Sequence, residues 1–358
     1  MPDDKTLPNA TVLGYRDKSA LSCPELKGGP TVRARHLGLI ACVTAVLAWT
    51  AAARAAPPYP TWPDAVVLAT ASPGGTYDVY GQGLARILTR VLGIQVGTRQ
   101  TGGPAQNIEL LERGEVQLAF VTMGVALQAW NGTEAWTGGR QLRGMRALFP
   151  MYDTPFHFVT LRESGIDRIA AMAGKRIGIG PLGGTAASYV PSFLGLLGVA
   201  GPQLADGTWA DLAQRLEAGG LDVLAVAAGV PFPAVAELEP RRKVAYVPLS
   251  ADEVIKLRLA HPELTPSVIH PGSYPSLNRP YETVGVYNFA VAREDLPDTL
   301  AYRIVETVFA QHEQMMEVHP AAAATVPRNF VHNTFMPFHA GAIRYYANTS
   351  PQGMMLAD

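Results

Sequence analysis

Cysteine is nearly absent from this chain of 358 residues, which has only Cys23 and Cys42. Both precede residue 56, where we expect the mature protein to begin. The mature chain would then contain neither a disulfide nor a thiol nucleophile. Its stability must come from core packing instead, and a chain of this length with 48% hydrophobic residues can bury a large core.

Net charge and sequence repeats are scarce as well. The chain has 29 Lys+Arg against 30 Asp+Glu, a formal net charge of −1, so it offers no electrostatic attraction for nucleic acid. We find no heptads, no fixed-period repeat and no long low-complexity tract. These absences exclude coiled coils, solenoids and basic nucleic-acid-binding arms, and they leave a globular protein of roughly two domains.

Catalytic motifs are also missing or incomplete. Residues 178–183 match the dinucleotide pattern G-x-G-x-x-G, but Pro181 is unusual there and no strand-final acid follows about 20 residues on. His312-Glu313 begins like a zinc-protease helix, yet Met316 stands where the second ligand belongs. No G-x-S-x-G motif and no P-loop occur, and the histidines after residue 55 are scattered. We therefore predict no enzyme activity, no cofactor and no metal site.

One long apolar run is present, at Leu37–Ala53. Basic residues precede it, and Ala53-Arg54-Ala55 at its end is an A-x-A cleavage site. We interpret residues 32–55 as a cleaved signal peptide and residues 1–31 as a non-native leader with no part in the fold. Because 17 residues are short for a spanning helix, which needs about 20, an uncleaved anchor is the weaker alternative.

The mature chain is organised around residues 66–107. An apolar run at Val66–Ala69 predicts a strand, a glycine-rich turn at residues 70–76 ends it, and apolar residues from Tyr80 to Leu92 recur at helical spacing. A second turn at residues 101–104 places Pro104 at a first helical position. Two helix N-termini beside one crevice indicate a small-ligand site, whereas each turn alone could equally be a simple connection.

Further strands and helices alternate along the rest of the chain, which predicts α/β architecture with mostly parallel sheets. A glycine turn at residues 183–185 resembles the one at 74–76 and suggests a second domain facing the same cleft. Pro191 predicts either a kinked helix or one whose regular part starts there. Other expected elements are separate strands at residues 144–149 and 156–161, a helix at 169–173, a strand at 284–292 and one long helix at 298–316.

Several motifs together resemble the TAXI family, the solute receptors of tripartite ATP-independent periplasmic (TRAP) transporters. The matching segments are modest individually, but they keep their order and spacing across about 290 residues. They are TASPGGTY at 70–77, TGGPAQNI at 101–108, GKRIGIG at 174–180 with GGT at 183–185, IHPGSY at 269–274 and MPFHAGA at 336–342.

The resemblance implies a two-lobed periplasmic-binding-protein fold of type II, in which each lobe is a mostly parallel sheet flanked by helices. Lobe 1 would comprise residues 56–157 and 285–358, and lobe 2 residues 158–284. The implied cleft residues supply main-chain and hydroxyl donors suited to a carboxylate. They are Gly75, Thr76, Tyr77, Gly103, Asn107, Thr122, Gly183, Gly184 and Thr185.

The implied function is capture of a small organic acid or amino acid in the periplasm and its delivery to TRAP membrane subunits. The cleft departs from similar receptors at residues 122–124, 183 and 186, where it is less polar and favours a more apolar acid. Two alternatives stay open. One is an envelope sensory or interaction protein with a degenerate cleft, and the weaker one is an NAD-linked enzyme binding at residues 178–183.

Overall fold

The computed structural model describes residues 61–349, which all belong to one compact unit, Ala56–Asp358. The predicted leader and signal peptide lie outside the described residues. The strands are β1 (Ala65–Ala69), β2 (Gln95–Arg99), β3 (Leu118–Thr122), β4 (Met145–Leu161), β5 (Arg176–Gly178), β6 (Gln203–Ala205), β7 (Val223–Ala227), β8 (Val244–Val247), β9 (Thr265–Ile269) and β10 (Tyr281–Arg293).

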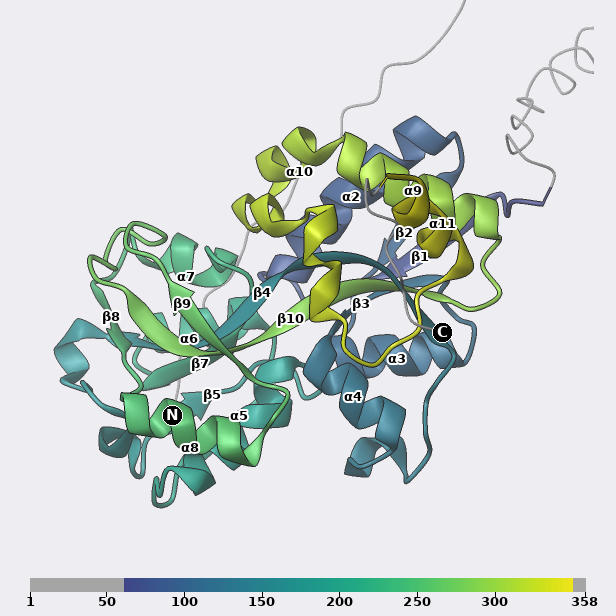
Figure 1. Cartoon of the computed structure of the whole chain (residues 1–358). Helices are drawn as coiled ribbons and strands as arrows, with labels where there is room; N and C mark the ends of the chain where they lie inside the picture. The colour runs from purple at the N-terminus through teal and green to yellow at the C-terminus, as the bar shows by residue number, and fades with distance from the viewer. Residues whose placement is uncertain (1–60, 350–358) are drawn as a thin grey trace, which may run out of the picture. The chain divides into compact units, whose positions relative to one another are not determined.

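Helices connect almost every pair of strands (Figure 1). The α-helices are α2 (Thr76–Leu92), α3 (Pro104–Glu112), α4 (Met123–Asn131), α5 (Thr185–Leu196), α6 (Trp209–Glu217), α7 (Pro233–Leu238), α8 (Ala251–Ala260), α9 (Asp298–Ala310), α10 (His312–Val318) and α11 (Ala340–Thr349). Short 3₁₀ helices are η1 (Ala135–Thr137), η2 (Arg162–Ser164), η3 (Ile169–Met172), η4 (Pro320–Ala324) and η5 (Pro327–His332).

The ten strands form one curled sheet in the order β2-β1-β3-β10-β4-β7-β5-β6, with β8 added to β4 and β9 to β10. At one end, β1 pairs in parallel with β2 and β3, and at the other end β5 pairs in parallel with β6 and β7. We call these the first end and the second end of the sheet. The antiparallel strands β4 and β10 join them. This arrangement confirms the predicted α/β fold with two parallel regions.

The first strand–turn–helix unit follows the predicted pattern. α2 buries Tyr80, Leu84 and Leu88 at spacings of four residues, so one face of the helix packs on the sheet. It begins after Gly75 and ends at Gly93, whose φ of 71° is the left-handed C-cap that glycine adopts without strain. α3 begins at Pro104, as predicted.

β4 is a single strand of 17 residues, so the prediction of two separate strands at 144–149 and 156–161 is wrong. Pro150 and Pro155 in the interval suggested a break, because proline cannot donate to a ladder. The ladder between β4 and β10 instead accommodates this interval with two register shifts, and nearly all of the interval is buried. The predicted lobe boundaries at 157/158 and 284/285 both fall within these two strands, and the division into lobes stays a prediction.

Two helix predictions are wrong in detail, and for a third the structure decides where the helix begins. The expected long helix at 298–316 is two helices, α9 and α10, because Gln311 between them leaves helical geometry with φ −105° and ψ 25°. The helix expected at 169–173 is the 3₁₀ helix η3. α5 starts at Thr185 and continues through Pro191, so its regular part does not begin at that proline.

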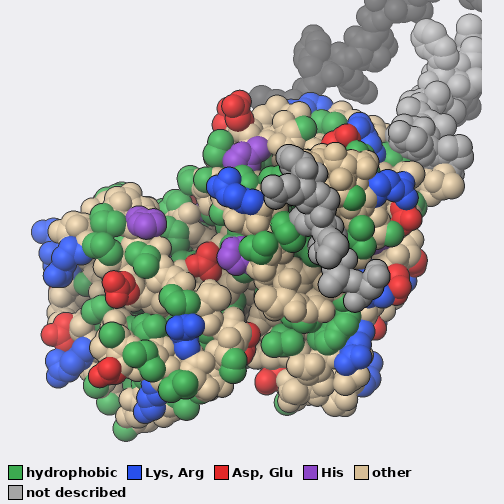
Figure 2. Space-filling model, viewed as in Figure 1, with side chains coloured by type: hydrophobic (Ala, Val, Ile, Leu, Met, Phe, Trp, Pro, Cys, Tyr) green, Lys and Arg blue, Asp and Glu red, His purple; other side chains and the backbone are tan. Residues whose placement is uncertain are grey.

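The surface agrees with the composition. Acidic and basic side chains are interspersed on the face shown in Figure 2. Between residues 61 and 349, no helix is both long and apolar enough to cross a membrane.

Asp153 of β4 lies where β9 and β10 pack against this strand, and its buried carboxylate makes the packing there testable. Its Oδ2 accepts a hydrogen bond from Ser267, whereas its Oδ1 is buried with no partner among the described residues. Gly285 makes room for the carboxylate, because a Cβ there would lie 2.6 Å from Oδ1. Burial raises the pKa of Asp153 to about 6.

We expect Asp153→Asn to become more stable relative to the wild type as the pH rises from 4 to 7. An unfolded aspartate has a pKa of about 3.9, so between about pH 4 and 6 the folded wild type binds the extra proton and loses stability as the pH rises. The relative gain should approach about 3 kcal/mol, which corresponds to a shift of about two pKa units. Urea unfolding across this range measures it.

Comparing the variant with the wild type also separates the effect of Asp153 on stability from that of His157. Burial lowers the pKa of His157 to about 4, which makes stability rise with pH over a similar window, but this contribution is present in both proteins and cancels in the difference. A stability difference that does not change between pH 4 and 7 would contradict the assignment.

Candidate functional site

A cavity of about 50 Å³ lies where the turns from both ends of the sheet meet. At the first end, Thr76 and Gly103 lie in the segments that follow β1 and β2, and Thr122 is the last residue of β3. At the second end, the turns that follow β5, β6 and β7 contribute Thr185, Trp209 and Gly229. The cavity therefore lies at the carboxyl ends of two sets of parallel strands, where α/β sheets bind ligands.

Most of the residues predicted for the cleft reach this cavity. Those in its wall are Gly75, Thr76, Tyr77, Gly103, Thr122, Gly184 and Thr185. The other lining residues are Ala71, Gly102, Pro104, Thr154, Trp209, Ala227, Ala228, Gly229, Phe232 and Asn288. The wall contains no charged side chain, and its aromatic and alanine residues make much of it apolar. Whether these residues bind a ligand stays a prediction.

Four helices of at least nine residues begin at the cavity. The N-caps of α2, α3, α4 and α5 are Gly75, Gly103, Thr122 and Gly184, and all four line the wall. None of them has a side-chain hydrogen bond that caps its helix. Since the first N–H groups of a helix have no acceptor within it, several main-chain donors and four positive helix-dipole ends converge here. Such an arrangement favours an anion.

The threonine hydroxyls differ in what they can offer a ligand. The Thr76 hydroxyl donates to the carbonyl of Gly229 at 2.9 Å, so its proton is already used. The hydroxyls of Thr122 and Thr185 lie 3.1 Å apart and share one hydrogen bond. One of their two protons is consumed by that bond, and the other remains available to an acceptor in the cavity.

Asn288 and Thr154 form a polar part of the wall that sequence reasoning missed. The Tyr77 hydroxyl donates to Asn288 Oδ1 at 2.6 Å, and Asn288 Nδ2 donates to the Tyr152 carbonyl and to Thr154 Oγ1. Burial raises the pKa of Tyr77 well above its usual value, so the phenol stays protonated. The signal available in the sequence was an asparagine within the mostly apolar segment 284–292, and the structure shows that this asparagine is fully buried.

Two predicted cleft residues lie outside the cavity wall. Asn107 is completely buried, and its Nδ2 donates to the carbonyls of Thr70 at 2.7 Å, Phe120 at 2.8 Å and Ala69 at 3.4 Å. Its Oδ1 accepts from the Thr101 hydroxyl at 2.6 Å. Asn107 therefore holds turns together, and its amide hydrogens are used within the protein. Its expected role in ligand binding stays a prediction.

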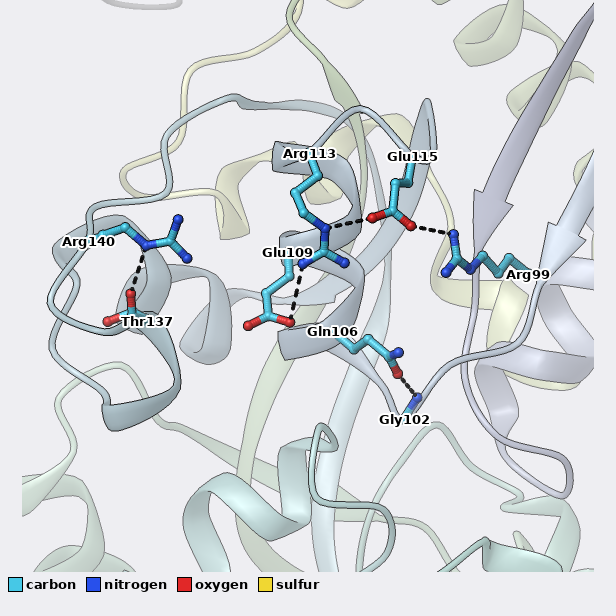
Figure 3. A network of polar contacts seen from close by, with 8 residues as sticks. All are labelled: Arg99, Gly102, Gln106, Glu109, Arg113, Glu115, Thr137 and Arg140. Atoms are coloured by element: carbon cyan, nitrogen blue, oxygen red, sulfur yellow. Dashed lines mark hydrogen bonds and ion pairs between the residues drawn. The ribbon is translucent and has the colours of Figure 1, made fainter.

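Gly183 is the second predicted cleft residue outside the wall. It lies at the second end of the sheet and contacts α3 of the first end. Its carbonyl accepts from the N–H of Ala105 at 3.1 Å, which links α3 of the first end to the turn before α5. On the same side, Gln106 Oε1 accepts from the N–H of Gly102 at 2.6 Å and fixes the turn before α3 (Figure 3).

The main chains of the two ends touch beside the cavity. Gly103 has a φ of 133°, and a Cβ on it would lie 2.8 Å from Gly184 Cα and 2.9 Å from the Gly183 carbonyl oxygen. Such distances are shorter than real Cβ contacts allow, so glycine at 103 is needed for this approach. The hydrogen bond from the Thr76 hydroxyl to the Gly229 carbonyl also links the two ends of the sheet.

The glycines of the G-x-G-x-x-G match contact the protein itself. A Cβ on Gly178 would meet Leu221 at 3.0 Å, and one on Gly180 would meet the Trp209 ring at 2.4 Å. Close packing of this kind explains both glycines without a cofactor. Within residues 61–349, no three His, Cys, Asp or Glu side chains are grouped in a way that could hold a metal ion.

Solved structures share this fold at low sequence identity. MatC from Rhodopseudomonas palustris with bound malate matches with a TM-score of 0.52 at 14% identity, covering 75% of this chain and 92% of that chain. The periplasmic binding protein BugD matches with a TM-score of 0.52 at 14% identity over 76% and 90%. A periplasmic transporter structure matches with a TM-score of 0.51 at 13% identity over 83% and 99%.

These likenesses show the fold alone, which is that of periplasmic solute-binding proteins. The family relationship comes from the sequence. The model of the NMT1-like family matches residues 68–349, a span that includes every residue of the cavity wall. This chain is a member of the NMT1-like family.

Proposed function

We propose that the protein is an extracytoplasmic solute receptor that captures a small organic acid or amino acid and delivers it to the membrane subunits of a TRAP transporter. The observation that carries the proposal is the convergence of four uncapped helix N-termini on one cavity. Export would use the signal peptide at 32–55. Residues 56–157 with 285–358, and residues 158–284, would be the two lobes that close on the ligand.

The ligand class follows from the wall. A carboxylate would lie against the N-termini of α2 and α5, with the free hydroxyl proton of the Thr122–Thr185 pair as a further donor. Since no lysine or arginine lines the cavity, a second carboxylate would have no cation to neutralise it. MatC is seen with malate, a dicarboxylate. For the present chain we favour a small monocarboxylate with an apolar remainder.

A thermal-shift screen of organic acids, amino acids and nucleotides tests this function. A true ligand at 100 times its Kd should stabilise the protein by about 2.7 kcal/mol and raise Tm by several degrees. Because the two proposed lobes close on the ligand, small-angle scattering should show a smaller radius of gyration with that ligand than without it. A shift with NAD alone would favour the NAD-linked enzyme, and no shift with any compound would favour an envelope interaction protein.

The hydroxyl pair gives a sharper test of the same site. In our proposal Thr122 donates to Thr185, whose own proton faces the ligand. Thr185→Val keeps the shape of the side chain and removes that hydroxyl, so a hydrogen bond to a charged group worth about 1.5–3 kcal/mol is lost. We expect ligand affinity to fall about 10- to 150-fold in calorimetry.

The matched control is Thr98→Val, an exposed threonine of β2 away from the cavity. Equal affinities for the two variants would place the carboxylate elsewhere.

A further inference from the structure

One hydroxyl donor in the cavity wall has no part in the function proposed so far. Thr154 of β4 lines the cavity and is 2% exposed, and Asn288 of β10 lies beside it. β4 and β10 run side by side and join the two ends of the sheet (Figure 1). Thr154 therefore reaches the cavity from the joining strands, apart from the helix N-termini.

The hydrogen bonds of Asn288 fix the direction in which the Thr154 hydroxyl donates. The Tyr152 carbonyl can only accept, so the Asn288 atom 2.6 Å from it is the amide nitrogen. The same nitrogen lies 2.5 Å from Thr154 Oγ1, which accepts its second hydrogen. The amide oxygen accepts from the Tyr77 hydroxyl. Because Thr154 is an acceptor in this network, its own proton is left for another partner.

That proton has no acceptor within residues 61–349. A buried donor without an acceptor is costly, so the hydroxyl suits an acceptor on a molecule bound in the cavity. The other free hydroxyl proton belongs to the Thr122–Thr185 pair. Thr122 is opposite Asn288 in the ladder between β3 and β10, and Thr154 is on β4 at the far side of β10. The cavity thus offers two separate hydroxyl donors.

Acceptors are scarce in the same wall. The carbonyls of Gly75, Gly103 and Gly184 accept from N–H groups within their own helices, and the Gly229 carbonyl accepts from Thr76. No aspartate or glutamate lines the cavity. An ammonium group would find no anion there and would face the positive ends of four helix dipoles. The second polar group of a ligand is therefore an uncharged acceptor.

We propose that Thr154 is a specificity-determining residue that selects oxo acids. Its hydroxyl donates to the ketone oxygen of a small oxo monocarboxylate, whose carboxylate lies at the Thr122–Thr185 pair. This inference rests on the proposed solute-receptor function and narrows its ligands from organic acids and amino acids to oxo acids. A ketone oxygen only accepts, which matches a donor without a partner. A cavity of about 50 Å³ has room for roughly four water-sized groups, so the acid is short.

Two series of acids with matched shapes test the selection by calorimetry on the wild-type protein. Pyruvate, lactate, isobutyrate and alanine carry an oxo, hydroxyl, methyl or ammonium group on the second carbon. Acetoacetate, 3-hydroxybutyrate, isovalerate and 3-aminobutyrate carry the same groups on the third carbon. In the series that fits, the oxo acid should bind about 2- to 12-fold more tightly than the methyl analogue, which leaves Thr154 unpaired. The amino acid should bind most weakly.

Thr154→Val keeps the shape of the side chain and removes its hydroxyl. We expect affinity for the oxo acid to fall about 2- to 12-fold and affinity for the methyl analogue to stay the same, so that the preference disappears. Thr154→Ser keeps the hydroxyl and should keep the preference. This second variant also serves if Thr154→Val is unstable, because valine leaves one Asn288 hydrogen without its acceptor. Thr98→Val, the exposed control on β2, should bind both acids like the wild type.

This inference and the receptor function fail in different ways. Equal binding of the oxo acid and its methyl analogue, or an undiminished preference in Thr154→Val, would overturn the role of Thr154 and leave the receptor function in place. Tightest binding of the amino acid would overturn the selection for an uncharged acceptor. No binding of any of these acids at millimolar concentration would overturn the inference, and only an empty thermal-shift screen would overturn the receptor function as well.

Discussion

Gly103→Ala is expected to lower ligand affinity by at least about 100-fold, equal to about 2.7 kcal/mol. The added Cβ would overlap Gly184 Cα and the Gly183 carbonyl, so the two ends of the sheet would have to separate. Separation breaks the bond from the Ala105 N–H to Gly183 and opens the cavity to water. Calorimetry with the ligand found by thermal shift gives the affinity, and small-angle scattering should show a larger radius of gyration with ligand than for the wild type.

The control separates backbone strain from overlap. Gly93→Ala also places alanine at a positive φ, here 71°, but nothing lies within 4 Å of the new Cβ. Both variants should lose some stability. Alanine at Gly93, in the left-handed region, is strained by about 1–2 kcal/mol, and alanine at Gly103, whose φ of 133° and ψ of −161° are essentially restricted to glycine, by about 1–3 kcal/mol. Only Gly103→Ala should lose ligand. If both variants bind like the wild type, contact between Gly103 and Gly184 is not required for binding.

Asn107→Leu is expected to destabilise the folded protein by about 3–5 kcal/mol. The substitution keeps the volume but removes the Nδ2 donor, which leaves the buried carbonyls of Thr70 and Phe120 without that partner. The Thr101 hydroxyl loses the closer of its two acceptors and keeps only the Thr70 carbonyl at 3.2 Å. A buried polar group left unsatisfied costs about 1–3 kcal/mol, and several are affected together. Urea unfolding at pH 7 measures the loss.

Asn131→Leu is the matched control, because Asn131 is an exposed residue at the end of α4. Its stability should stay within about 0.5 kcal/mol of the wild type, as is usual for surface substitutions. Wild-type stability for Asn107→Leu combined with lost ligand binding would instead assign Asn107 to the ligand, as the sequence alone suggested.

Local chemistry predicted the parts of the site that lie on single turns. The turns around Gly75, Gly103 and Gly184 were found from the sequence because glycine, proline and hydroxyl residues follow apolar strands in a fixed order. The same reasoning could not assign Asn107, because an asparagine in the first turn of a helix can bind either a ligand or the neighbouring main-chain turn. Its three carbonyl acceptors come from β1 and β3 and the turn after β1, which only folding brings together.

The features that the sequence did not predict depend on pairing between strands far apart in the chain. β4 runs through Pro150 and Pro155 because β10 pairs along it on both sides of its irregularities, which no local propensity reveals. Asn288 and Thr154 reach the cavity for the same reason, since both lie on those two strands. Trp209 was missed because it follows the short strand β6, whose three residues carry little periodic signal.

Because the wall of the cavity carries no charged side chain, the wall itself should not respond to pH. Glycine, alanine and threonine do not titrate, and the one phenol in the wall, Tyr77, has a pKa raised further by burial. Helix N-termini carry fixed partial charges that no proton can remove. The wall therefore imposes no protonation step between acidic and neutral pH, and an acid bound there would be held or released according to the ionisation of its own carboxyl group.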